Sequence, residues 1–497
     1  MQLHLFGDIA RYEPENIVRL FLPHEAVELT DVEPDGQNGV GISAGVCECD
    51  GKAVARCRVR LSDYDRADTM PLISVPHTEL WGNPEELTVC TLLYRMLCDL
   101  FDTAQPWGLL TGVRPVKLLR RLAAALGEDE ACRYFGDILL CSEEKTRLAR
   151  ETLHAEDAVL SLSTPRSCSL YVSVPFCPSR CSYCSFVSQT TERSQYLIPR
   201  YVELLCREIE ATGALVRERG LTPETVYIGG GTPTTLSAEQ LAAVMGAIAD
   251  AVDVAALREY TVEAGRPDTV TAAKLQAIMN GGATRLSINP QTLHDDVLER
   301  IGRRHTTAEF YRAFERARQA GFTHINTDLI AGLPGDTRDG FAASLDGVLA
   351  LDPESVTVHT LSMKRASHLV IRGKDDYDAG GDTPQMVSYA CDRLRETGYH
   401  SYYLYRQSRC VGNQENTGWA KDGHDGLYNV FMMDETHTVL GCGAGAVTKL
   451  KDPDGEFLKR IFNYKFPYEY NARFEEMLRR KEQVREFYES YGYGDHA

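Results

Sequence analysis

Six short apolar runs occur between residues 169 and 362, and segments of helical character separate them. The runs are SLYVSVPF (169–176), TVYIGGG (225–231), EYTVEAG (259–265), TRLSINPQ (284–291), HINTDLIAG (324–332) and SVTVHTLS (355–362). Strands that alternate with helices predict parallel βαβ units. A closed barrel of this kind has eight such units. Six units therefore predict an α/β fold with an open, partial (βα)6 barrel.

The pattern differs on both sides of this alternation. Near the N-terminus, MQLHLFG is typical of a strand, and GVGISAGVCECDGKAVARCRVRL predicts two strands around the turn residues Asp50 and Gly51. PEELTVCTLLYRMLCDLFD predicts an amphipathic helix. After residue 397 the sequence is rich in aromatic and amide side chains, and a charged helical tail follows. We expect an N-terminal α+β module with a helical connector (1–165), the barrel (166–396) and a C-terminal α+β extension (397–497).

Charge and cysteine content narrow the class of protein. The 497 residues carry 53 Lys and Arg against 71 Asp and Glu, a net charge of −18, which argues against a nucleic-acid partner. The N-terminus lacks the basic and apolar parts of a signal peptide, and no run reaches the length of a membrane helix. We therefore expect a cytoplasmic protein without a membrane span. Outside one cluster, the cysteines are expected to be small buried hydrophobes.

That cluster is Cys177, Cys181 and Cys184, spaced C-x3-C-x2-C after the first strand of the barrel. Chemistry gathers at the C-terminal ends of strands in parallel α/β folds. Three thiolates can hold three irons of a [4Fe–4S] cluster and leave the fourth iron open to an outside ligand. A zinc site would need a fourth ligand, and neither Cys168 nor His154 has the usual spacing. The pattern favours iron–sulfur over zinc, and zinc over a chance group of structural thiols.

Polar residues and glycines follow the other strands. The second strand ends in GGGTP (229–233), where glycines allow close approach of a ligand and free N–H groups could bind a carboxylate. The next three strands carry polar groups at or near their ends, namely Glu263, Asn289, Gln291 and Asp328. We expect Arg303 on the helix that follows the strand with Asn289 and Gln291. Such groups are unfavourable inside apolar strands unless paired or functional. A structural hydrogen bond explains any one of them equally well, but their recurrence favours ligand binding.

The motifs YVSVPFC, GGGTPT, VEAGRPD, RLSINPQT and TDLIAGLPG, in this order, resemble the radical S-adenosylmethionine (SAM) superfamily. Within it, approximately residues 168–450 are similar to the oxygen-independent coproporphyrinogen III oxidase group. PWGLLTGVRPVKLL and the YYLYRQ…GNQENTGWA block are most similar to the coproporphyrinogen dehydrogenase branch, which has a long N-terminal extension. The resemblance implies a [4Fe–4S] cluster on Cys177, Cys181 and Cys184. It implies contacts to one or two SAM molecules from Tyr171, Tyr183, Gly230, Gly231, Thr232, Glu263, Gln291, Arg303 and Asp328.

The resemblance also implies a reaction in porphyrin and heme biosynthesis. SAM cleavage gives a 5′-deoxyadenosyl radical, which removes a hydrogen atom from a propionate of a coproporphyrinogen III-like tetrapyrrole. Loss of CO2 and one electron leaves a vinyl group. A one-electron reductant such as flavodoxin or ferredoxin is expected, and no amino-acid side chain is assigned a catalytic role.

Several further residues have two interpretations each. Lys364, Arg365 and Arg406 are candidates to bind propionates, with a solvated surface as the alternative. Tyr402, Tyr403 and Tyr405 could pack on the macrocycle or on the barrel edge. GCGAGA (441–446) lacks dinucleotide-binding spacing, and we expect a close backbone approach near the barrel mouth.

One position departs from the oxidase pattern. The well-characterised oxidases have another cysteine two residues after the third ligand, where this chain has Phe186. Relatives that are heme chaperones or heme-degrading methyltransferases also lack that cysteine. Two alternatives to the dehydrogenase therefore stay open, namely a heme-binding transfer protein and an anaerobic heme-modifying methyltransferase.

Overall fold

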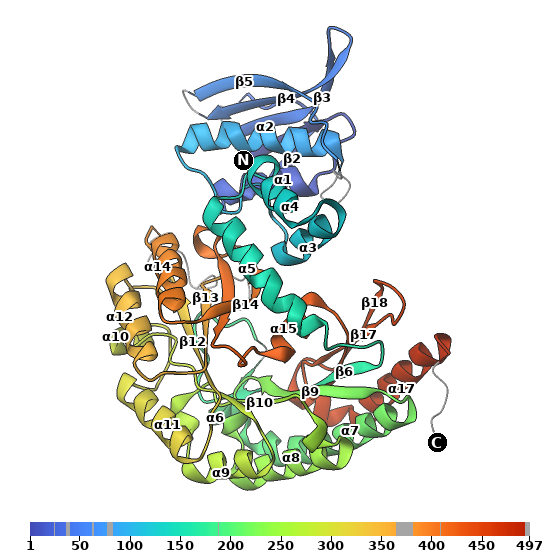
Figure 1. Ribbon diagram of the computed structural model, residues 1–497, viewed down its shortest axis with the longest axis vertical. Helices are drawn as coiled ribbons and strands as arrows, with labels where there is room; N and C mark the ends of the chain where they lie inside the picture. The colour runs from blue at the N-terminus through green and yellow to red at the C-terminus, as the bar shows by residue number, and fades with distance from the viewer. Residues whose placement is uncertain are drawn as a thin grey trace. The chain divides into compact units, whose positions relative to one another are not determined.

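The computed structural model describes residues 1–23, 25–35, 40–61, 64–76, 83–186, 188–363, 381–407 and 409–492. The chain forms two compact units, coloured along the sequence in Figure 1. The first comprises Met1–Leu153 with Leu404–Glu415, and the second His154–Tyr403 with Asn416–Ala497. The units differ from the three expected parts, because residues 404–415 join the first unit and the other C-terminal residues join the second.

The first unit contains, in its described residues, a five-stranded sheet of order β2-β1-β3-β4-β5. Its strands are β1 (Gln2–Phe6), β2 (Glu28–Thr30), β3 (Gly41–Cys49), β4 (Lys52–Leu61) and β5 (Tyr64–Pro71). The expected hairpin joins β3 to β4, and its turn residues Asp50 and Gly51 have φ of 50° and 74°, the left-handed values that such tight turns use. The strand β5, which is antiparallel to β4, was not predicted.

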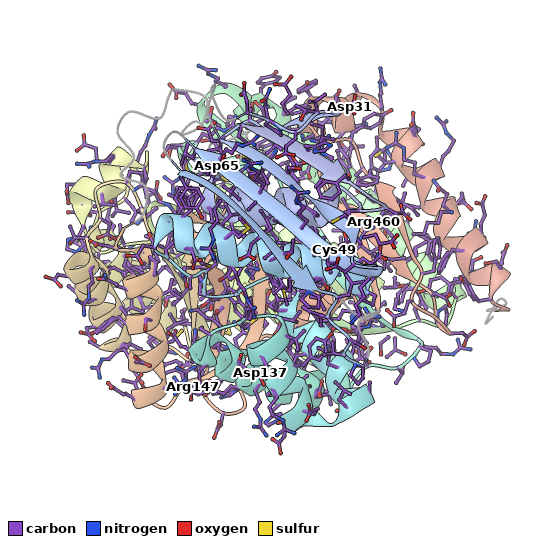
Figure 2. All side chains as sticks on the ribbon, turned by 90° about the horizontal axis from the view of Figure 1, so that it is seen from above. Asp31, Cys49, Asp65, Asp137, Arg147 and Arg460 are labelled. Carbon is purple, nitrogen blue, oxygen red and sulfur yellow. The ribbon has the colours of Figure 1, made fainter. Side chains whose placement is uncertain are left out.

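Helix α2 (Pro84–Phe101) covers one face of this sheet. Among the described residues of this region, the helices are α1 (Tyr12–Phe21), α2 (Pro84–Phe101), α3 (Pro115–Leu126), α4 (Glu128–Arg133) and α5 (Glu143–Leu160), and η2 (Tyr134–Ile138) is π-helical. Along β4 the buried Cys57 and Val59 alternate with the more exposed Arg58, as expected for a half-buried strand. Arg58 lies 2.8 Å from Asp65 of β5, which Figure 2 labels. The sheet therefore has one apolar face, against α2, and one charged face.

The second unit contains, in the described residues, an eleven-stranded sheet of order β14-β15-β13-β12-β11-β10-β9-β6-β16-β17-β18. Six neighbouring strands are parallel and follow chain order: β6 (Ser167–Val174), β9 (Thr222–Gly230), β10 (Glu259–Glu263), β11 (Arg285–Ser287), β12 (Ile325–Ala331) and β13 (Ser355–Thr360). The predicted partial (βα)6 barrel is confirmed.

The helices that connect these strands lie along the outer side of the barrel (Figure 1). They are α7 (Ile198–Glu218), α8 (Ala238–Ala251), α9 (Ala272–Asn280), α10 (Asp295–Arg300), α11 (Thr307–Gln319) and α12 (Arg338–Leu349). Two of them begin with a reciprocal cap, Ser237 with Gln240 at α8 and Thr306 with Glu309 at α11. Such caps satisfy backbone N–H groups that a helix leaves unpaired, and they fix where the helix begins.

The C-terminal region extends this sheet at both edges. Its elements are α14 (Thr383–Glu396), β14 (His400–Arg406), β15 (Glu415–Ala420), α15 (Leu427–Asp434), β16 (Thr438–Cys442), β17 (Val447–Lys451), β18 (Leu458–Phe462), α16 (Pro467–Ala472) and α17 (Phe474–Ser490). The strand β16 runs parallel to β6, and β15 runs antiparallel to β13. In the part of the chain that the structure describes, no helix has the length and apolar character needed to cross a bilayer.

Candidate functional site

The three clustered cysteines lie on the loop that follows β6. The loop begins with β7 (Phe176–Cys177), which pairs with β8 (Gln189–Thr190), and α6 (Thr191–Ser194) follows. The hydroxyl of Ser179 donates to the carbonyl oxygen of Gly302 at 2.8 Å. The N–H of Ser182 donates to the carbonyl oxygen of Ile301 at 2.9 Å. Both hydrogen bonds hold the loop against the chain segment after α10.

Each thiol of the loop has a polar or cationic neighbour. The hydroxyl of Thr232 donates to the sulfur of Cys177 at 3.5 Å, and the guanidinium of Arg266 lies 3.8 Å from the sulfur of Cys181. Burial raises the pKa of Cys184 to about 11, and the positive charge of Arg303 opposes this rise. Cationic neighbours and hydrogen-bond donors stabilise a thiolate, the form that binds metals.

Three thiols on one loop are a donor set that fits a multi-iron cluster. Among the described residues, no three His, Cys, Asp or Glu side chains converge closely enough to share one metal ion. In a [4Fe–4S] cluster each thiolate binds its own iron, so its ligands stand apart. Cys168 lies near the beginning of β6, six residues and roughly 20 Å from the end of that strand. Cys168 is therefore excluded as the fourth ligand of a zinc site.

Backbone N–H groups at the end of β9 have protein partners that the sequence did not predict. The N–H of Gly231 donates to the carbonyl oxygen of Val174 at 2.9 Å, and that of Thr232 to the carbonyl oxygen of Phe176 at 2.8 Å. The backbone of Gly230 acts to lower the pKa of Glu263. The expectation of free N–H groups for a carboxylate ligand is therefore wrong for Gly231 and Thr232, which tie the end of β9 to β6 and to the cysteine loop. Contact of these three residues with SAM stays a prediction.

The inner face of the barrel carries one row of partly exposed polar side chains. In β6, β12 and β13, which are otherwise buried, the partly exposed residues are Tyr171, Asp328 and His359. Tyr227 of β9 and Glu263 at the end of β10 are also partly exposed. These residues come from five strands and interact with one another, so the barrel gathers them on one side.

Aromatic rings occupy the β6 and β9 side of this row. Tyr171 stands opposite Tyr227 in the strand register, and their ring centroids lie 6.3 Å apart. Both rings stack on Tyr428 of α15, at 6.2 Å and 4.5 Å. The hydroxyl of Tyr227 donates to Glu263 at 2.5 Å. Burial raises the pKa of Glu263 to about 7, and the hydrogen bond from Tyr227 opposes this rise.

Asp328, another residue of this row, contacts Asn326 and His359. The amide of Asn326 donates to Asp328 at 2.8 Å, and Nε2 of His359 lies 3.6 Å from the other carboxylate oxygen. Burial acts to raise the pKa of Asp328, but His359 and Asn326 outweigh it and leave the pKa below its usual value. Asp328 is therefore held ionised, while Glu263 is poised to titrate near neutral pH.

Arg303 joins three segments near the cysteine loop. It lies after α10, which ends at Arg300, so the expectation that it belongs to a helix is wrong. Its Nη1 donates to the carbonyl oxygens of Gly265 at 2.9 Å and Asn289 at 3.0 Å. Its Nη2 donates to the hydroxyl of Tyr183 at 3.1 Å.

Gln291 connects the segment after β11 to β12. Its N–H donates to the carbonyl oxygen of Asp328, and its carbonyl oxygen accepts from the N–H of Ile330, both at 3.0 Å. Its φ of 71° is in the left-handed region. The structure thus brings the predicted site residues into two neighbouring groups, one around the cysteine loop and one on the inner face of the barrel.

Four residues of these groups were not singled out from the sequence, namely Arg266, Tyr227, His359 and Tyr428. A signal existed for Tyr227, because a residue two positions before Gly229 on a strand faces the same side. Arg266 directly follows Gly265 at a strand end, which is where functional groups gather. For Tyr428 no local signal existed, since α15 comes long after the barrel strands in the chain.

For some of the residues with two interpretations, the structure shows their surroundings. Arg406 is buried in the first unit, where its guanidinium lies 5.6 Å from the Trp107 ring centroid and donates to the carbonyl oxygen of Leu110. The interpretation of Arg406 as part of a solvated surface is therefore wrong, and propionate binding by it stays a prediction. Tyr402 is buried against Arg285, 3.2 Å from its guanidinium. Lys364 and Arg365 lie outside the described residues.

The close backbone approach expected at Gly441–Ala446 is confirmed. A Cβ at Gly443 would lie 2.6 Å from the carbonyl oxygen of Ser173. The hydroxyl of Ser173 donates to the carbonyl oxygen of Ala444 at 2.8 Å. This loop therefore packs directly on the end of β6.

Comparisons with known proteins agree with this geometry. The radical SAM superfamily profile matches residues 171–347. The oxygen-independent coproporphyrinogen-III oxidase-like protein HemZ of Bacillus subtilis is 38% identical over 377 residues, which cover 75% of this chain and 75% of HemZ. The heme chaperone HemW of B. subtilis is 32% identical over 310 residues, which cover 60% of this chain and 77% of HemW.

A solved structure shares the fold. Coproporphyrinogen III oxidase (HemN) from Escherichia coli superposes with a TM-score of 0.52 at 22% identity, over 66% of this chain and 73% of HemN. Radical SAM proteins use a [4Fe–4S] cluster and SAM, and the thiol environment described above fits such a cluster. This chain therefore belongs to the oxygen-independent coproporphyrinogen III oxidase-like family of the radical SAM superfamily, and its cofactors are a [4Fe–4S] cluster and SAM.

Proposed function

We propose that this protein is an oxygen-independent coproporphyrinogen III dehydrogenase, an oxidoreductase of heme biosynthesis. The observation that carries the proposal is the 38% identity to HemZ over 75% of both chains. The row of polar side chains on the inner face of the barrel supports it, because a reaction on a bound cosubstrate needs several side chains directed at one place.

The reaction removes two propionate carboxyl groups from the tetrapyrrole. The cofactors, when bound, supply a 5′-deoxyadenosyl radical that takes one hydrogen atom from the β-carbon of a propionate. The bond to the carboxylate then breaks, CO2 leaves, and one electron passes to an acceptor, so that a vinyl group remains. A one-electron reductant such as flavodoxin or ferredoxin supplies the electron for SAM cleavage.

The side chains of this protein have binding roles in this proposal. Cys177, Cys181 and Cys184 bind the cluster, with Arg266 and Thr232 favouring their thiolate forms. Near them, Tyr171, Gly230 and Glu263 contact the SAM that the cluster binds, and the Glu263 carboxylate accepts hydrogen bonds from the SAM amine or ribose.

A second SAM molecule is part of the proposal. Tyr183, Gly231, Thr232, Gln291, Arg303 and Asp328 are expected to line the SAM sites. Two of them already touch, since Arg303 donates to Tyr183. The proposed setting is cytoplasmic, where flavodoxin-type reductants act.

The test is anaerobic turnover by the full-length protein. After cluster reconstitution, SAM, dithionite and coproporphyrinogen III are added, and 5′-deoxyadenosine, CO2 and tetrapyrrole products are measured. We expect two losses of CO2 per tetrapyrrole, each accompanied by 5′-deoxyadenosine. Formation of 5′-deoxyadenosine without CO2 from this substrate would contradict the proposal.

A second candidate function is heme binding and transfer. It is favoured by the 32% identity to HemW and by Phe186, an exposed residue where the well-characterised oxidases have a cysteine. In the same assay, tight heme binding without decarboxylation would support the carrier. Methylation or opening of added heme, with SAM consumed, would instead support a heme-modifying methyltransferase.

A further inference from the structure

Tyr227 is placed to control the carboxyl group of Glu263. It lies on β9, directly opposite Tyr171 of β6, and its ring stacks on both Tyr171 and Tyr428. These contacts leave its hydroxyl directed at β10, where it donates to Oε1 of Glu263 at 2.5 Å. A hydrogen bond to a carboxylate of this length is at the strong end of the usual range.

Gly229 makes this contact possible. A Cβ at this position would lie 2.8 Å from Cε1 of Tyr227, 3.1 Å from the carboxyl carbon of Glu263 and 3.2 Å from its Oε1. The first distance is shorter than real Cβ contacts allow, so a larger residue would displace the Tyr227 ring. The first glycine of GGGTP therefore has a steric function that is specific to the Tyr227–Glu263 pair.

The backbone of Gly230, also on β9, acts in the same direction as Tyr227 and lowers the pKa of Glu263. The other titratable groups that face Glu263 are Tyr171 of β6, Asp328 of β12, His359 of β13 and Tyr428 of α15. Asp328 opposes ionisation of Glu263, and a protonated His359 favours it.

We propose that Tyr227 is a positioning residue, whose hydroxyl holds Glu263 in the orientation and the ionised state that bind SAM. This rests on the proposed contact between Glu263 and SAM. An ionised carboxylate accepts hydrogen bonds from the SAM amine or ribose, whereas a protonated one loses much of this capacity. Tyr227 itself touches Glu263 and the two aromatic rings, so it acts through Glu263.

The geometry gives the expected effect of removing the hydroxyl. Without the Tyr227 donor, the ionised form of Glu263 loses one charge-assisted hydrogen bond, and the pKa of Glu263 rises from about 7. The loss of such a bond corresponds to an upward shift of about one pH unit. SAM binding to Tyr227→Phe should therefore need a higher pH than binding to the wild-type protein.

The experiment measures the dissociation constant of SAM between pH 6 and pH 9 with the reconstituted full-length protein. The variants are Tyr227→Phe, Gly229→Ala and Glu263→Gln. The matched control is Tyr260→Phe, since Tyr260 is buried on the adjacent strand β10 and its hydroxyl has no hydrogen-bond partner among the described residues. The SAM amine titrates identically in all samples, so differences between the profiles come from the protein.

We expect the pH midpoint of binding to move up by about one unit in Tyr227→Phe, with affinity about fivefold weaker near pH 7 and similar to wild type near pH 9. Gly229→Ala should shift the midpoint in the same direction, and Tyr260→Phe should not shift it. In a Glu263→Gln background, Tyr227→Phe should have no further pH-dependent effect.

The outcomes separate this inference from the proposed function. An unchanged midpoint in both Tyr227→Phe and Gly229→Ala, with normal SAM binding by the wild-type protein, overturns the role of Tyr227 and leaves the proposed function standing. A wild-type protein that binds no SAM at any pH overturns both. A shift that persists in the Glu263→Gln background also overturns the inference, because the effect then does not pass through Glu263.

Discussion

Arg303 donates a hydrogen bond of 3.1 Å to the hydroxyl of Tyr183, a residue that lies between the second and third clustered cysteines. The same guanidinium donates to the carbonyl oxygens of Gly265 and Asn289, which follow two neighbouring barrel strands. One side chain therefore ties the cysteine loop to the ends of β10 and β11. This explains how a long loop keeps a fixed position at the barrel end.

Arg303→Met should loosen the cysteine loop. The change leaves two carbonyl oxygens and the Tyr183 hydroxyl without their donor, at a cost of about 2–4 kcal/mol. We expect lower iron content after reconstitution and a lower urea midpoint. The control is Arg304→Met, because Arg304 is exposed and lies 3.9 Å from Glu192 in a surface ion pair. Equal iron content in the two variants would contradict the tethering role of Arg303.

Thr232→Val should change the electronic properties of the cluster while leaving its iron content unchanged. The hydroxyl of Thr232 donates to the sulfur of Cys177 at 3.5 Å. Hydrogen bonds to cluster sulfurs raise the reduction potential. Loss of one weak bond should therefore lower the potential by about 40 mV or less. A redox titration followed by electron paramagnetic resonance measures it.

The control for that titration is Thr225→Val. Thr225 lies on β9, the strand that precedes Thr232, but its hydroxyl pairs with Ser169 at 2.7 Å. Its variant should keep the wild-type potential. A higher potential in Thr232→Val, or the same shift in both variants, would contradict the assignment.

Lys481→Met should strongly destabilise the second unit. Lys481 of α17 lies 3.1 Å from Glu208 of α7, and both side chains are buried. Glu208 also accepts from the N–H of Gly443, so the pair supports the loop that packs on β6. Removal of one partner leaves a buried charge and should cost about 3–5 kcal/mol in the free energy of unfolding.

Urea unfolding compares this variant with Arg485→Met on the same helix. Arg485 is 35% exposed and pairs with Glu218 at 2.8 Å, so its loss should cost about 1 kcal/mol or less. The double variant Glu208→Gln/Lys481→Met should be more stable than Lys481→Met alone, because no charge is then buried unpaired. A similar decrease in the free energy of unfolding for Lys481→Met and Arg485→Met would show that burial of the Lys481–Glu208 pair does not increase its effect on stability.

Glu263→Gln should stabilise the cofactor-free protein in a pH-dependent way. Since burial raises the pKa of Glu263 to about 7 from the usual 4.5, the folded state binds this proton more tightly than the unfolded state does. The contribution of Glu263 to stability is therefore most favourable below pH 4.5 and is lost as the pH rises through 7. A neutral glutamine avoids this loss, which amounts to roughly 3 kcal/mol.

We expect Glu263→Gln to be more stable than wild type at pH 8 and similar to wild type at pH 4.5. Glu315→Gln on the exposed side of α11 serves as the control and should differ little from wild type at either pH. A stability difference for Glu263→Gln that is the same at both pH values would contradict the raised pKa.

Most of the barrel could be predicted because its signals are local. Each of the six parallel strands is an apolar run that a helical pattern follows, and both features appear within a short window of sequence. The edge strands could not be predicted in this way. β16 pairs with β6, with Thr438 opposite Cys168, and that pairing joins segments from opposite ends of the second unit.

The same limit applies to the candidate site. The spacing of Cys177, Cys181 and Cys184 is a local signal, and so is a carboxylate such as Glu263 in an apolar strand. The use of the glycine N–H groups by the cysteine loop depends on tertiary pairing, and so does the stacking of Tyr428 on Tyr227. Arg406 was misjudged because a sequence does not show whether an arginine is buried on a tryptophan or exposed.

The central claim is that Cys177, Cys181 and Cys184 hold a cluster that cleaves SAM. Its most direct measurement is the iron, sulfide and 5′-deoxyadenosine content of anaerobically reconstituted protein treated with SAM and dithionite, for wild type, Cys181→Ala and Cys168→Ala. The account predicts about four irons and four sulfides per chain, with 5′-deoxyadenosine formed, for wild type and Cys168→Ala, and neither cluster nor product for Cys181→Ala. Zinc in place of iron, or a Cys181→Ala variant that keeps both cluster and product, would contradict it.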